Sequence, residues 1–338
     1  MKEFRILLLV SVITFITYFG IEPLAHSVMH PHMEAADFEY KDLAPIDGKG
    51  DAKVGKELAL AYCVSCHSIN SDNVPLPVSK EILIAEFGVH SKVDVNFEKL
   101  ANRYLSELYG VVPLDLSDIP TIYDEKFLKS FIKDPANAAF ESTFNLHKKK
   151  QMHLDIANAQ SETEIDHIKK TTVKDIESFK NKNKIAMPNL GIDDTSVNHI
   201  VAYFKSIAKP LTPKESLELA CGRCHGVEYD KVVATAPEAI LNKYLGKTPP
   251  DLSMMIRSKG REYLTIFLND PQKVLIGSSM PRVGINEETE AKIVTYLENV
   301  GDAKKQERES LGIWVIFYFI IFTLLAYLWK RQIWSQVK

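Results

Sequence analysis

Two long runs without charged residues lie near the ends of the chain. The run at residues 311–329 is followed at once by Lys330 and Arg331, and tryptophan and tyrosine stand near its two ends. A helix of this length is about 28 Å long, close to the hydrocarbon thickness of a bilayer. A buried core helix usually keeps a polar stripe, and this run has none. The pattern therefore predicts a transmembrane anchor at 311–329.

The N-terminal run is shorter and has a less definite meaning. Uncharged residues extend from 6 to 21, between two basic residues and Glu22. That length suits either a short membrane span or the core of a signal peptide. The pattern predicts an N-terminal membrane span or signal anchor at 1–22, followed by a linker at 23–50, and leaves open whether the segment is cleaved.

Between these runs, four blocks of sequence occur twice in the same order. The pairs are VGKELALAYCVSCHS and LTPKESLELACGRCHG, PLDLS and PPDLS, FLKSFIKDP and YLTIFLNDP, and MPNLGIDDTSVNHIVAYFKSI and MPRVGINEETEAKIVTYLENV. Hydrophobic residues in the last pair fall at helical spacing, and Asp193, Asn286 and Thr212 stand where helix N-caps are expected. The blocks predict a mainly α protein with two tandem domains, 51–209 and 210–303.

The two copies differ in length between their third and fourth blocks. The first copy has 51 residues there, 136–186, and the second has eight, 272–279. The longer segment is rich in charged and polar residues. It predicts a solvated helical excursion from the surface of the first domain.

Charge and cysteine content narrow the class of function. The formal net charge is -3, so no large basic face is implied and nucleic acid is not expected as a partner. All four cysteines belong to two C-x-x-C pairs, and each pair is followed by histidine. Zinc ribbons place such pairs about 15–20 residues apart, whereas 154 residues separate Cys66 from Cys221. C-x-x-C-H is instead the pattern of covalent c-type haem attachment.

The residue types suit that chemistry. Two cysteines on one helical turn can both form thioether bonds to one planar porphyrin. The adjacent histidine can then bind the haem iron as the proximal ligand, with methionine as the sixth ligand. Met187 and Met280 each precede proline at the same place in the two copies, whereas Met152, Met254 and Met255 have no such match. The predicted cofactors are two covalently bound haem c groups. The predicted cofactor-binding and metal-ligating residues are Cys63, Cys66, His67 and Met187 in the first domain, and Cys221, Cys224, His225 and Met280 in the second.

These motifs, with the repeated DLS and Met-Pro blocks, resemble the class I cytochrome c family twice over, across roughly residues 50–300. Two such domains between an N-terminal hydrophobic segment and a C-terminal span resemble the dihaem cytochrome c subunit of a bacterial cytochrome bc1 complex, a quinol:cytochrome c reductase. The resemblance implies an electron-transfer subunit with no independent catalytic site. It also implies cytochrome b and the Rieske iron–sulfur protein as partners, and a soluble or oxidase-bound cytochrome c as acceptor. The long insert in the first domain departs from a minimal cytochrome domain.

Basic residues flank both hydrophobic runs, and basic flanks favour the cytoplasmic side of a membrane. Both ends of the chain are therefore expected in the cytoplasm. Residues from about 30 to 305 are then expected on the periplasmic side of a bacterial inner membrane, where covalent haem attachment takes place. An alternative is the dihaem subunit of a cbb3-type oxidase, although such subunits usually carry an N-terminal anchor. A dihaem peroxidase is a second alternative, and two intact Met-Pro loops argue against the open iron site that it needs.

Overall fold

The computed structural model describes residues 2–29, 35–88, 96–138, 151–182, 187–275 and 278–336. The described residues are mainly helical and form no named strand, only isolated bridges between extended residues. The chain divides into two compact units, residues 1–35 and 36–338. The predicted mainly α class, with apolar helices in both terminal segments, is confirmed.

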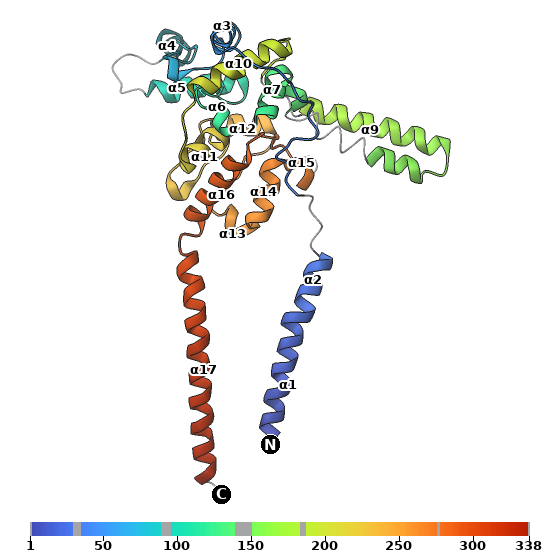
Figure 1. The fold of residues 1–338 in the computed structure, drawn as a ribbon, viewed down its shortest axis with the longest axis vertical. Coiled ribbons are helices and arrows are strands. Elements are labelled where there is room, and N and C mark those ends of the chain that lie inside the picture. The colour runs from blue at the N-terminus through green and yellow to red at the C-terminus, as the bar shows by residue number, and fades with distance from the viewer. Residues whose placement is uncertain are drawn as a thin grey trace. The chain divides into compact units, whose positions relative to one another are not determined.

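The N-terminal unit is a helix of three consecutive parts (Figure 1). The parts are α1 Lys2–Ile16, the π-helical turn η1 Thr17–Ile21, and α2 Glu22–Met29. The sequence predicts an end at Glu22, but the helix continues beyond it. The π turn ends two residues before Pro23, and the N–H of Glu22 donates to the carbonyl of Thr17. A proline has no N–H and crowds the preceding turn, and a wider π turn accommodates both effects.

The first repeat, residues 51–209, is held together by the crossing of its first and last helices. Helix α3 packs against α10 (Figure 1), and the buried Gly55 lies against the backbone of His199 at the crossing. Asp51 caps α3, and the predicted cap Asp193 begins α10 by accepting from the backbone of the next turn. The described helices of this repeat are α3 Ala52–Tyr62, η2 Asn70–Asp72, α4 Lys80–Phe87, α5 Phe97–Tyr109, α6 Ile119–Ile122, α7 Glu125–Lys133, α9 Glu162–Lys182 and α10 Asp194–Ile207.

The second repeat, residues 210–303, is built in the same way. Its first helix, α11, packs against its last, α16 (Figure 1). The predicted capping box is present, since Thr212 accepts from the N–H of Glu215 and the Glu215 carboxylate accepts from the N–H of Thr212. Asn286 caps α16, as expected. The described helices of this repeat are α11 Pro213–Cys221, η4 Glu228–Asp230, α12 Glu238–Leu245, α13 Met255–Lys259, α14 Arg261–Asn269, α15 Pro271–Val274 and α16 Glu287–Gly301.

The two repeats share one hydrophobic core, which contains buried residues from both. At their boundary the backbone of Tyr123 pairs with that of Ile285, and the N–H of Asp124 donates to the carbonyl of Gly284 at 3.0 Å. Residues 36–50, in the segment expected to be a linker, contribute to the packing. Tyr40 is fully buried, and its hydroxyl donates to the carbonyl of Ile285 at 2.6 Å.

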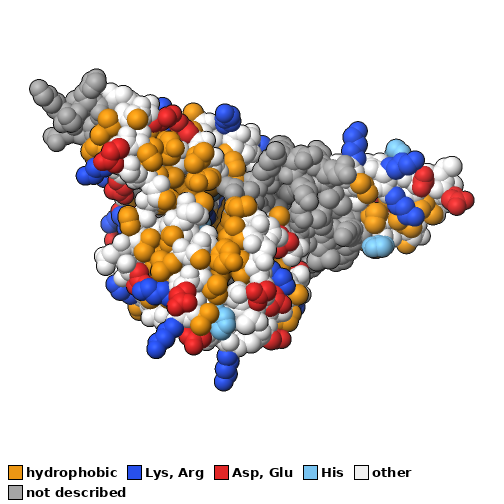
Figure 2. All heavy atoms as spheres, turned by 90° about the horizontal axis from the view of Figure 1, so that it is seen from above, with side chains coloured by type: hydrophobic (Ala, Val, Ile, Leu, Met, Phe, Trp, Pro, Cys, Tyr) orange, Lys and Arg blue, Asp and Glu red, His pale blue; other side chains and the backbone are white. Residues whose placement is uncertain are grey.

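The insert of the first repeat is helical where the structure describes it, at residues 151–158 and in α9. Its side chains there are mostly exposed, including those of His153 and His167, and charged groups of both signs lie on it (Figure 2). This agrees with the predicted solvated helical excursion.

The C-terminal segment is a single long helix, α17 Lys305–Gln336, which contains the predicted span 311–329. Its hydrophobic side chains are exposed throughout. Both Phe4–Ala25 and Lys305–Gln336 are long and apolar enough to cross a membrane. The molecule therefore has two candidate membrane helices.

Candidate functional site

The first C-x-x-C-H motif begins where α3 ends. Cys63 is the C-cap of the helix, and the chain makes one further turn in which the N–H groups of Cys66 and His67 both donate to the carbonyl of Cys63, at 3.1 and 3.0 Å. The two thiols and the imidazole are therefore all carried by this single turn of the chain, residues 63–67. Nδ1 of His67 lies 2.8 Å from the carbonyl oxygen of Leu114 in the PLDLS block.

The second motif has the same geometry. The N–H groups of Cys224 and His225 donate to the carbonyl of Cys221 at 3.0 and 2.9 Å. Nδ1 of His225 lies 2.8 Å from the carbonyl oxygen of Pro250, which holds the same position in PPDLS that Leu114 holds in PLDLS. A carbonyl can only accept, so in both motifs Nδ1 carries the proton and Nε2 is the nitrogen left for a metal.

Aspartates in the DLS blocks fix the loops that carry these carbonyls. Asp115 accepts from the hydroxyl of Ser68 at 2.7 Å and from the backbone of Asn70 at 3.0 Å, so it ties its loop to the residues that follow the first motif. Asp251 accepts from the backbone of Glu228 at 2.8 Å. The histidine and its carbonyl partner are therefore braced by a second contact in each repeat.

Burial favours the neutral form of both motif histidines and of the first cysteine in each motif. It lowers the pKa of His67 and of His225, and it raises the pKa of Cys63 to about 11 and of Cys221 to about 12. Redox-active and metal-binding cysteines use the thiolate, which buried apolar surroundings disfavour. Across the part of the chain that the structure describes, no three His, Cys, Asp or Glu side chains come together to hold a metal ion.

Met187 and Met280 occupy matched positions. Each lies partly buried in the loop that precedes the last helix of its repeat, Met187 before α10 and Met280 before α16. Met280 packs against the main core, and its N–H donates to the hydroxyl of Ser278 at 3.2 Å. Their role as sixth ligands stays a prediction.

Two polar contacts near the motifs are not visible in the sequence pattern. The sulfur of Cys66 lies 3.6 Å from the hydroxyl oxygen of Tyr109, at the end of α5. Arg223, between the cysteines of the second motif, interacts with the hydroxyl of Tyr123 from the first repeat. Both pairs join segments far apart in the sequence, and no short motif could have identified them.

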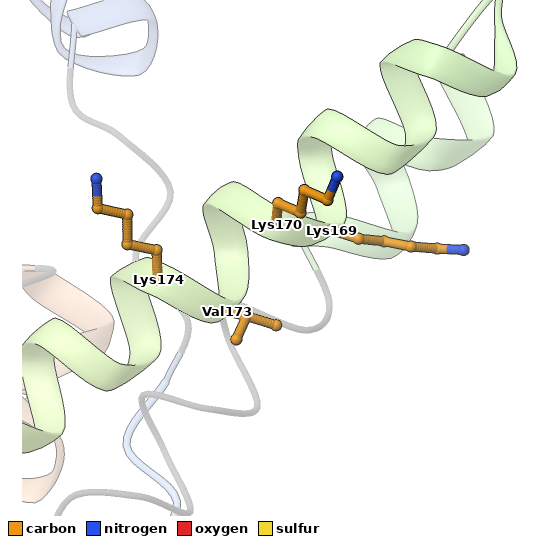
Figure 3. Close-up of a pocket in the computed structure, with 4 residues that line it drawn as sticks. All are labelled: Lys169, Lys170, Val173 and Lys174. Carbon is orange, nitrogen blue, oxygen red and sulfur yellow. The ribbon is translucent and has the colours of Figure 1, made fainter.

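A separate surface depression lies on α9 and is lined by Lys169, Lys170, Val173 and Lys174 (Figure 3). It belongs to the insert and contains no residue of either motif. Three lysine ammonium groups around one small apolar side chain do not form an enclosed cofactor site.

No family model matches the chain, and no curated protein matches it. Among solved structures, a chain described as "Hyperthermophilic respiratory Complex III" aligns with a TM-score of 0.31 and 24% sequence identity, covering 37% of this chain and 75% of that chain. A TM-score of this size is too low to establish a common fold.

Proposed function

We propose that this chain is a membrane-anchored dihaem c-type cytochrome that carries electrons. The observation that carries the proposal is the matched geometry of the two motifs, in which the histidine of each C-x-x-C-H bonds a carbonyl at 2.8 Å through Nδ1. A single zinc or redox site gives no reason for that geometry to occur twice. Two haem sites of one design do.

The residues present fit covalently bound haem. Thiols can add to the two vinyl groups of a porphyrin and become uncharged thioethers, which suits positions that are buried or partly buried. Each imidazole is neutral and held by its Nδ1–H bond, so that Nε2 is oriented as a proximal ligand. When bound, the haem iron supplies reversible one-electron oxidation and reduction, with a potential that its axial ligands and surroundings set.

The protein's own residues then have defined tasks. Cys63 and Cys66 hold one haem and Cys221 and Cys224 the other, while His67 and His225 are the proximal ligands. Met187 and Met280 are the sixth ligands in this proposal, because their loops have the same place in the two repeats. The shared core of the two repeats keeps the two sites in one body.

The membrane helices and the two haem motifs suggest a respiratory role. In the proposal the chain is a subunit of a quinol:cytochrome c reductase in a bacterial inner membrane, with its haem domains, 51–209 and 210–303, in the periplasm. It takes electrons from a Rieske iron–sulfur protein beside cytochrome b and passes them to a periplasmic or oxidase-bound cytochrome c.

Haem counting tests the central claim. A pyridine haemochrome assay on the purified chain is expected to give two covalently bound c haems, and the double variant Cys63→Ala/Cys66→Ala one. One haem or none in the unmodified chain would contradict the proposal. For the ligands, Met280→Ala is expected to remove the near-infrared sulfur-to-iron band of one haem while the other band persists.

The partner assignment has its own test. The tagged chain, solubilised in mild detergent, is expected to co-purify with a Rieske protein and a cytochrome b. Co-purification with a copper-containing oxidase instead would transfer the chain to the cbb3-type alternative and leave the haem assignment intact.

A further inference from the structure

The loop that carries Met280 differs from its counterpart in the first repeat at one charged position. Arg282, two residues after Met280, has a fully buried side chain and forms an ion pair with Asp42. The corresponding residue of the first repeat is Asn189, which is exposed and accepts from the N–H of Gly191 in its own loop at 2.9 Å. The second repeat therefore has a buried cation where the first has an exposed amide.

The partner of Arg282 belongs to the segment 36–50, which precedes both repeats. The guanidinium carbon of Arg282 also lies over the ring of Tyr40, 4.4 Å from the ring centroid, and such a contact is favourable for a desolvated cation. The hydroxyl of Tyr40 donates to the carbonyl of Ile285 at 2.6 Å. One segment from outside the second repeat therefore contacts the Met280 loop at two of its residues.

The rest of the Met280 loop is anchored on both sides. Before the methionine, the side-chain amide of Gln272 donates to the carbonyl of Ser278 at 2.6 Å, and the hydroxyl of Ser278 accepts from the N–H of Met280 at 3.2 Å. After it, Gly284 packs against the first repeat, since a Cβ atom there would lie 1.9 Å from the ring of Phe127. The conformation of this loop is therefore set by contacts along its whole length.

Stability alone gives no reason to bury the ion pair of Asp42 and Arg282. Removing two charges from water costs about as much free energy as their attraction returns, so apolar residues of the same volume are often equally stable there. An ion pair does restrict the chain to one arrangement, because a buried guanidinium that loses its carboxylate is uncompensated. Pro281, between Arg282 and Met280, has a fixed φ and limits independent movement of the two residues. The place of Arg282 therefore restricts where the sulfur of Met280 lies.

We propose that Asp42 and Arg282 are positioning residues for Met280, and that they fix the conformation of the loop from which Met280 binds the second haem. This inference rests on the proposed function, which makes Met280 the sixth ligand of that haem. Because Asn189 takes the place of Arg282 in the first repeat, the effect of the pair is expected at the second haem alone.

The expected effect of breaking the pair is loss of the sulfur ligand. Asp42→Asn leaves the buried guanidinium without its counter-charge, so Arg282 is expected to move toward water and to displace the Met280 loop. Ligation by methionine and histidine raises the reduction potential of haem iron. The variant is therefore expected to lose the sulfur-to-iron band of the second haem and to lower the midpoint potential of that haem.

The experiment uses the full chain in detergent, with Met187→Ala as the background so that only the Met280 band remains in the near-infrared. In this background Asp42→Asn is expected to lose most of the band and to shift one midpoint to lower potential in a spectroelectrochemical titration. Asp42→Glu keeps the carboxylate and is expected to retain more of the band. Asp47→Asn removes an exposed carboxylate of the same segment and is the matched control, with band and midpoints expected to stay in place.

A second control separates positioning from general destabilisation. Thr212→Ala removes the cap of α11, in the same repeat but outside the Met280 loop, and is expected to keep the band. Loss of the band in Thr212→Ala to the same extent as in Asp42→Asn would show that the band follows overall stability, and it would overturn the positioning role.

The outcomes also separate this inference from the proposed function. A haem count other than two in the unmodified chain, or a band that persists when Met280→Ala is added to Met187→Ala, contradicts the proposed function. Two haems with an unchanged band and midpoint in Asp42→Asn overturn only the role of the ion pair. If Asp42→Asn does not accumulate, Arg282→Lys decides the question, because it keeps the charge but lacks the planar group that lies over Tyr40. A weaker band in Arg282→Lys supports the inference, and an unchanged band overturns it.

Discussion

At the scale of single residues, the same ion-pair network is repeated in both halves of the chain. Asp230 accepts from the hydroxyl of Tyr296 at 2.6 Å and pairs with Lys214 at 2.8 Å. Asp72 accepts from Tyr203 at 2.7 Å and pairs with Lys56 at 2.6 Å. Each aspartate therefore connects the turn after its C-x-x-C-H motif to the first and last helices of its repeat.

This network predicts a pH dependence of stability. The contacts of Asp230 with Lys214 and Tyr296 lower the pKa of its carboxyl group, so the folded state binds the proton less readily than the unfolded chain does. The stabilisation by Asp230 is present above the unfolded pKa of about 3.9 and is lost as pH falls through the lower folded pKa. Asp230→Asn is therefore expected to lower the free energy of unfolding at pH 7, with the difference from the unmodified chain shrinking below about pH 4.

Urea unfolding, followed by circular dichroism at pH 7 and below about pH 4, checks this expectation. Glu57→Gln, which changes an exposed carboxylate on α3, is the control and is expected to change little at either pH. A stability difference for Asp230→Asn that is the same at pH 7 and at acid pH would contradict an ionic origin.

Residues could be predicted from the sequence where a local rule applies to them. The C-x-x-C-H pairs and the caps Asp193, Asn286 and Thr212 were recognisable because their chemistry acts over a few neighbouring positions. The burial of Tyr40 and the interaction of Arg223 with Tyr123 were not, because both join segments that lie a hundred residues or more apart in the sequence.

At the scale of helices, the crossing of α3 and α10 depends on the absence of a side chain at Gly55. A Cβ atom there would lie 1.9 Å from the carbonyl oxygen of His199 and 2.9 Å from Cβ of Tyr203. Gly55→Ala must push the helices apart and is expected to cost about 1–3 kcal/mol of stability. Thermal unfolding of the variant checks this, with Lys53→Ala on the exposed face of α3 as the control. An unchanged melting temperature in Gly55→Ala would mean that the helices cross less closely.

The start of α11 gives a second prediction at this scale. Thr212 accepts from the N–H of Glu215 at 3.3 Å, and the Glu215 carboxylate accepts from the N–H of Thr212 at 2.8 Å. Thr212→Ala leaves a helical N–H without its partner and is expected to destabilise the protein by about 1 kcal/mol. Thr212→Ser keeps the hydroxyl and is expected to retain most of the stability in the same urea titration. Equal losses in the two variants would show that the hydroxyl is not the stabilising group.

Helices could be predicted from the sequence where they have clear hydrophobic periodicity, a recognisable cap and a counterpart in the other repeat. Residues 36–50, within the expected linker, were not, because the segment has neither periodicity nor a repeat partner. The structure packs it on both repeats: Lys126 of the first donates to the carbonyl of Tyr40 at 2.7 Å, and Asn269 of the second donates to that of Asp37 at 3.1 Å.

At the scale of the whole molecule, the shared core determines how the two repeats are held together, and the two apolar helices determine whether the chain crosses a membrane. The core buries residues of both repeats together, so the haem sites of the proposal belong to one body rather than to two beads on a string. The helices Phe4–Ala25 and Lys305–Gln336 leave their hydrophobic surface outside that core. Whether one or both of these helices cross the membrane decides the topology of the chain.

We expect both helices to span the membrane, with the N-terminal one uncleaved. A chain that ends at Lys304 lacks α17 but keeps Phe4–Ala25, and it is expected to remain in the membrane fraction after a carbonate wash. Adding Ile13→Arg to that shortened chain puts a charge near the middle of the remaining span, at a cost of about 2.5–3.5 kcal/mol for insertion, and is expected to release the protein. If the shortened chain without Ile13→Arg is soluble and mass spectrometry finds a trimmed N-terminus, the segment is a cleaved signal, and α17 alone anchors the protein.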